Sequence, residues 1–171
     1  MITYQDVHNA FVNESGWPRS ESVPIALFKQ WAAESDLEVR GALHHFLRHN
    51  PKYPKIDPPL SVQQEFDFFT TYFKDCFAVP RDFADESDHI LAGFDLWHAL
   101  SYWVADFWRA LPQGSCLRSD LAEWLKDMCI QHGEIAVAVS DHVFCHKKIR
   151  SSFLEWTDNP LLAQLFPELR Q

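Results

Sequence analysis

Residues 94–108, FDLWHALSYWVADFW, constrain the fold more than any other stretch of the chain. When residues 88–111 are placed on a helical wheel at about 100° per residue, apolar side chains cover well over half of the circumference. These side chains are Ile90, Phe94, Leu96, Trp97, Leu100, Trp103, Val104, Phe107 and Trp108. A helix that is apolar around most of its surface is normally buried by its neighbours. The stretch therefore predicts a central, mostly apolar helix at residues 88–111.

The polar residues of this helix fall on one narrow strip. Asp88, Asp95 and Asp106 lie within it, and Tyr102 and Arg109 lie beside it. Because an unpaired buried carboxylate is costly, the strip must reach water or meet partners. One interpretation is a solvated edge with local pairs, such as Asp106 with Arg109 three residues later; this is the commoner role of a charged strip. The other is a contact surface, which makes these five residues the candidate partner-binding site.

Helix-start signals recur along the rest of the chain. Thr3–Asp6 and Ser61–Gln64 have the spacing of capping boxes, and Asp36 is placed to cap a further helix. Residues 134–146 alternate in a way that also suits a strand, but their alanines favour a helix. No strand–loop–helix unit is visible. The sequence therefore predicts an all-α helical bundle of about seven to nine helices.

The chain length favours one domain. A chain of 171 residues, 47% of them hydrophobic, is long enough to bury a substantial core, so we expect a single domain over residues 1–171. Residues 51–60, PKYPKIDPPL, contain four prolines and predict an extended connector between an N-terminal helical part and the main bundle. This connector is either a hinge between two halves or a stiff segment that runs along one domain.

Net charge limits the classes of partner. The chain carries a net charge of −9, and an acidic surface repels both phosphate backbones and anionic lipid head groups. We therefore expect no nucleic-acid partner and no membrane partner. The same charge suits either plain solubility or binding to a basic protein.

Cysteine spacing and the N-terminal residues indicate the compartment. The four cysteines form no CxxC pair, so buried free thiols are expected. Residues 1–12 show no basic stretch followed by an apolar run, the pattern of a signal peptide. The sequence predicts a cytoplasmic protein.

Two histidine pairs give a weak metal hypothesis. His45 with His49, and His142 with His146, are spaced four residues apart, and two such pairs on facing helices could bind zinc. Both pairs also lie near expected helix C-termini, where cationic or polar side chains interact favourably with the helix dipole. Since the pairs lack a defined family spacing, we expect no metal and no cofactor.

No catalytic fingerprint is found in the sequence, so a non-enzymatic function is expected. The favoured hypothesis is a small protein-binding domain, and an immunity or antitoxin protein that neutralises a basic toxin fits its size and charge. The alternatives are the zinc-binding bundle and a small-ligand pocket formed around Trp97, Trp103 and Trp108, although aromatic residues at helical spacing usually form core.

Overall fold

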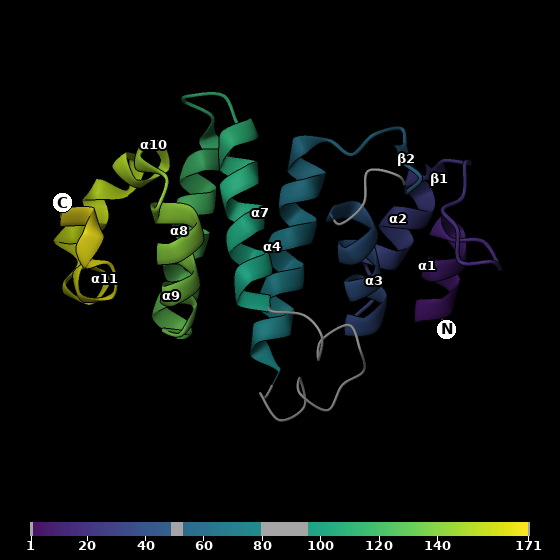
Figure 1. Ribbon diagram of the computed structural model, residues 1–171, viewed down its shortest axis with the longest axis horizontal. Helices are drawn as coiled ribbons and strands as arrows, with labels where there is room; N and C mark the ends of the chain where they lie inside the picture. The colour runs from purple at the N-terminus through teal and green to yellow at the C-terminus, as the bar shows by residue number, and fades with distance from the viewer. Residues whose placement is uncertain (1, 49–52, 80–95, 171) are drawn as a thin grey trace. The chain divides into compact units, whose positions relative to one another are not determined.

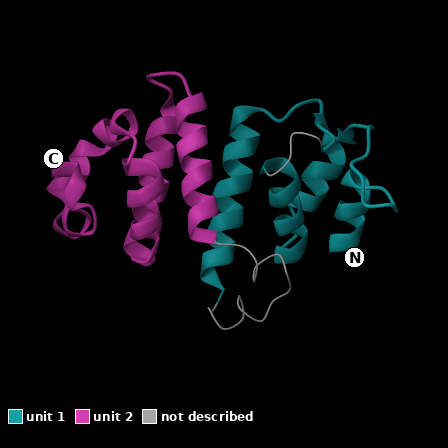
Figure 2. Cartoon of the chain, viewed as in Figure 1, with its two compact units in different colours: residues 1–93 teal, residues 94–171 magenta. Residues whose placement is uncertain are grey.

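The computed structural model describes residues 2–48, 53–79 and 96–170, and these residues are mostly helical (Figure 1). They form nine α-helices, short 3-10 and π-helical segments, and a single two-stranded ladder. The prediction of an all-α fold with seven to nine helices is confirmed. The chain divides into two compact units, residues 1–93 and 94–171 (Figure 2). That residues 1–171 form one domain stays a prediction.

The described residues of unit 1 form four α-helices, and the sequence signals most of their starts locally. They are α1 (Tyr4–Phe11), α2 (Ile25–Ala32), α3 (Leu37–Arg48) and α4 (Val62–Ala78). Both predicted capping boxes are present: the Thr3 and Ser61 hydroxyls accept from the backbone of Asp6 and Gln64, whose side chains accept from the cap backbone in return. The Asp36 carboxylate accepts hydrogen bonds from the first turn of α3, as expected for a cap.

The proline-rich connector belongs to unit 1. Its described residues, 53–60, contain β2 (Ile56–Asp57), which pairs in parallel with β1 (Val23–Pro24). A backbone hydrogen bond holds the two strands together: Val23 N donates to Lys55 O at 2.9 Å. Neither residue is a proline, so the donor N–H is available. The connector is extended as predicted. It lies between α3 and α4 in the chain, and its strand β2 pairs with β1, which directly precedes α2.

An antiparallel pair of helices, α3 and α4, forms the core of unit 1. Arg40 near the start of α3 pairs with Asp75 near the end of α4, and Arg48 at the end of α3 lies 3.3 Å from Glu65 near the start of α4. Between these ion pairs His44 is buried against aromatic rings of α4, with its ring stacked on Tyr72 at a centroid distance of 5.0 Å. The two charged ends therefore enclose an aromatic interior.

Unit 2 begins with two long helices and ends with several short ones. Its elements are α7 (Leu96–Ala110), α8 (Cys116–Gln131), α9 (Ile135–Val139), a π-helical segment (Ser140–Phe144, hereafter the π segment), α10 (Lys147–Arg150), α11 (Pro160–Leu165) and 3-10 turns at Ser151–Asp158 and Pro167–Arg170. The helix predicted over residues 134–146 is present, although its second half is π-helical. Asn159 caps α11 by accepting from Leu161 N and Leu162 N.

Helix α7 contributes large buried side chains to the core of unit 2. Trp103, Val104, Phe107 and Trp108 are all buried. Residues 88–95 of the predicted helix lie outside the described residues, and its central position stays a prediction. Within the described part of the chain, none of the helices combines the length and the apolar character needed to cross a bilayer.

The capping box of α4 can be tested directly. Ser61→Ala removes the side-chain acceptor for Gln64 N, which lies 3.1 Å from Ser61 Oγ, and should lower the free energy of unfolding by about 1 kcal/mol. Thr71→Ala, at an exposed position in the middle of the same helix, should leave stability unchanged or slightly higher. Urea unfolding followed by circular dichroism measures both values, and equal effects of the two variants would contradict the assignment.

Candidate functional site

The candidate site is the exposed face of α7, which we define as Tyr102, Asp106 and Arg109. These residues recur at four and three positions, so they share one side of the helix, and all three are exposed. Arg109 Nη1 lies 3.1 Å from Asp106 Oδ1, which is the local ion pair that the sequence predicted. Asp88 and Asp95, the other two members of the predicted strip, lie outside the described residues.

Tyr102 is the prominent side chain on this face. It is 57% exposed, yet its ring rests on His142 of the π segment, with the two ring centroids 4.6 Å apart. His142 in turn meets the edge of His98, also at 4.6 Å between centroids. The imidazoles of His98 and His142, both half-buried, therefore adjoin the exposed face of α7. Together these side chains offer hydrogen-bond donors, acceptors and ring faces.

The π segment brings His142 to this position. A π turn closes i→i+5 hydrogen bonds, and such turns are frequent at functional sites. The sequence placed His98 and Tyr102 on the same helix but gave no sign that His142 would join them. The contact depends on how α9 and the π segment pack against α7, and that packing is tertiary.

The four histidines of the metal hypothesis are not brought together within either unit. His45 is exposed on α3 of unit 1, and His49 lies outside the described residues. The prediction that His142 and His146 share a helix is wrong, because the π segment ends at Phe144 and His146 has the extended backbone of a helix N-cap (φ −87°, ψ 103°). Among the described residues, no group of three or more His, Cys, Asp or Glu side chains is arranged to hold a metal ion.

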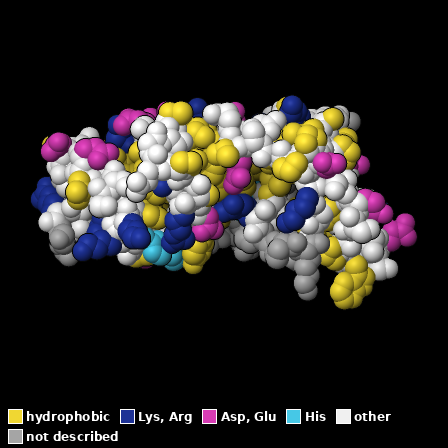
Figure 3. Space-filling model, turned by 90° about the horizontal axis from the view of Figure 1, so that it is seen from above, with side chains coloured by type: hydrophobic (Ala, Val, Ile, Leu, Met, Phe, Trp, Pro, Cys, Tyr) yellow, Lys and Arg dark blue, Asp and Glu magenta, His cyan; other side chains and the backbone are white. Residues whose placement is uncertain are grey.

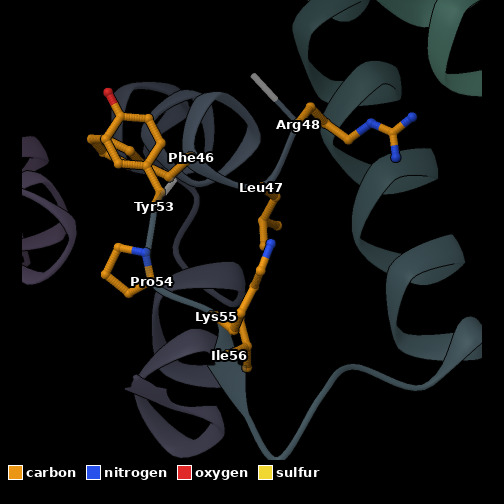
Figure 4. Close-up of a pocket in the computed structure, with 7 residues that line it drawn as sticks. All are labelled: Phe46, Leu47, Arg48, Tyr53, Pro54, Lys55 and Ile56. Atoms are coloured by element: carbon orange, nitrogen blue, oxygen red, sulfur yellow. The ribbon is translucent and has the colours of Figure 1, made fainter. Parts of the chain in front are cut away.

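Unit 1 has a surface hollow of about 250 Å³. Figure 4 shows Phe46 and Tyr53 on one side, with Leu47 and Lys55 beside each other, while the Arg48 side chain points away toward α4. The volume is below the range of about 300–1,000 Å³ that is typical of small-molecule pockets. With the Arg48 guanidinium engaged by Glu65, the hollow has few polar groups that converge on a ligand.

The tryptophans proposed to line an apolar pocket pack into the core of unit 2. Trp103 is buried against Phe107 and Trp124, and Trp108 against Phe153. The Arg118 guanidinium also covers the Trp108 ring at 5.3 Å. Trp97 is partly buried. In this packing Trp103 and Trp108 contribute to the core.

Comparison of the chain with family models, curated proteins and solved structures finds no match.

The cysteines divide into two classes that differ from the expectation of four buried thiols. Cys76 and Cys129 are buried, whereas Cys116 and Cys145 are exposed. Burial raises the pKa of Cys76 and of Cys129 to about 12, so both thiols stay protonated well above neutral pH. The thiolate is the reactive form, which leaves the exposed pair as the reactive cysteines.

We expect two fast and two slow thiols in a reaction of the folded protein with a disulfide reagent at pH 8. Cys145→Ser should remove half of the fast amplitude, because that thiol is exposed, and Cys76→Ser should leave the fast amplitude unchanged. At pH 9 the two buried thiols should still react slowly, because burial keeps the pKa of Cys76 and of Cys129 well above that pH. Three or four fast thiols in the folded protein would contradict the burial of Cys76 and Cys129.

Proposed function

We propose that this chain is a non-enzymatic protein-binding domain that contacts its partner through the exposed face of α7. The observation that carries the proposal is Tyr102, a large ring left 57% exposed on a helix whose neighbouring rings Trp103, Phe107 and Trp108 are buried. Tyr and Arg are enriched among the residues that dominate binding energy at protein interfaces. Arg109 lies on the same face and is held by its ion pair with Asp106.

The net charge of −9 supports a basic partner, because complementary charge speeds the encounter between two proteins. Apolar side chains also reach the surface among charged ones on the face shown in Figure 3. Neutralisation of a basic toxin in the cytoplasm, as an immunity or antitoxin protein, is the specific role that we propose. That role rests on size and charge by analogy.

The test compares partner capture by three tagged forms of the full chain in cells of its source. Wild-type protein should enrich a basic protein, and Tyr102→Ala should weaken its binding about 30-fold in calorimetry, the loss expected of a residue worth about 2 kcal/mol. Asp106→Lys should also weaken binding, because it removes a carboxylate and leaves Arg109 without its ion-pair partner.

Two exposed positions outside the α7 face provide controls. Trp17→Ala removes an exposed ring from unit 1, and Asp120→Lys reverses an exposed acid on α8; neither should change affinity more than about twofold. Binding that is lost in these controls but retained by Tyr102→Ala would place the interface elsewhere. A captured partner with a toxic activity that the wild-type chain suppresses on co-expression would support the immunity role, and unchanged toxicity would contradict it.

A further inference from the structure

A second surface of unit 2 lies on the other side of the helical segment that carries His142. It is a groove of about 510 Å³ between α9 with the π segment on one side and α11 with the following 3-10 turn on the other. Its apolar wall includes Ala136, Val137, Leu161 and Leu165. Val137 is 68% exposed and Leu161 is 43% exposed, so these two side chains present apolar surface to solvent.

Carboxylates line the same groove. Asp141 of the π segment is exposed, and Glu168 accepts a hydrogen bond from Ser140 Oγ that holds it in place. Within the described residues, neither carboxylate has a Lys or Arg partner. The groove therefore combines an apolar wall with two negative charges that no neighbouring cation neutralises.

We propose that this groove binds an amphipathic segment of a partner protein, with apolar side chains against Val137 and Leu161 and a Lys or Arg against Asp141 and Glu168. Helices with apolar anchors spaced three and four residues apart commonly bind such grooves. A cation on the segment completes the charge that the groove lacks. This site does not involve the exposed face of α7 and stands independently of the function proposed for it.

Other occupants suit the groove less well. A small ligand is normally 70–90% enclosed by its pocket, whereas Val137 and Leu161 are open to solvent. Anionic lipid is repelled by the two carboxylates. A second copy that docked groove to groove would bring like charges together across a two-fold axis.

The probes are three labelled 18-residue peptides, and the readout is fluorescence anisotropy with the full chain. One peptide is helical with a leucine stripe and lysines, the second has the same composition without the stripe, and the third carries glutamate in place of lysine. Only the first should bind tightly, since only it supplies both the apolar anchors and the positive charge. Equal binding of the striped and unstriped peptides would reduce the interaction to charge alone and would overturn the proposal.

Matched variants locate the binding. Val137→Ser, and separately Asp141→Asn with Glu168→Gln, should each weaken the first peptide about tenfold. The controls Leu154→Ser and Glu155→Gln alter exposed residues of the same unit outside the groove and should bind as wild type. Circular dichroism confirms that each variant is folded.

Two further outcomes would count against binding of an amphipathic segment in this groove. No binding of the first peptide at millimolar concentration, or equal loss in the groove and control variants, would overturn the proposal. Self-association of the peptide-free chain that Val137→Ser abolishes in sedimentation would assign the groove to a second copy instead. Tyr102→Ala should bind the peptide as wild type, so failure of the α7 proposal and failure of this one are distinguished.

Discussion

The packing of aromatic rings around Phe144 is the interaction on which the C-terminal half of unit 2 depends. Helices α9, α10 and α11 have five, four and six residues, and isolated helices shorter than about 12 residues are marginal in water. Their stability must come from tertiary contacts. Phe144 lies 4.9 Å from Phe166, 5.1 Å from Phe153 and 5.7 Å from Trp156 between ring centroids, and so ties the π segment to the elements that follow it.

This anchoring explains how one short segment contributes to two surfaces. Phe144 and Val143 are buried, which fixes the π segment and leaves its other side chains to point elsewhere. His142 contacts α7 through Tyr102 and His98, while Ser140 bonds to Glu168 at the groove. A shift of the segment would therefore disturb both surfaces, even though they share no side chain.

The sequence predicted what is encoded locally. The capping boxes at Thr3 and Ser61, the cap at Asp36 and the Asp106–Arg109 pair all involve residues within four positions of one another. The pairing of Val23 with Ile56 and the meeting of His98 with His142 join residues over 30 apart, and no periodicity encodes such contacts. The π turn was also not predicted, because π turns are rare and the pattern of residues 134–146 indicated an ordinary α-helix.

The two surfaces use negative charge in different ways. On the α7 face, Asp106 is already paired with Arg109, so little local charge is left, and in our proposal the specific contact comes from the Tyr102 ring. In the groove, neither Asp141 nor Glu168 has a Lys or Arg partner among the described residues. Their carboxylates are therefore available to a cation at short range. At physiological ionic strength, salt screens the interaction between exposed charges beyond about 8 Å. For the proposed basic partners, we therefore expect the net charge of −9 to set mainly the rate of association, and the Tyr102 ring and the groove carboxylates to set mainly the rate of dissociation.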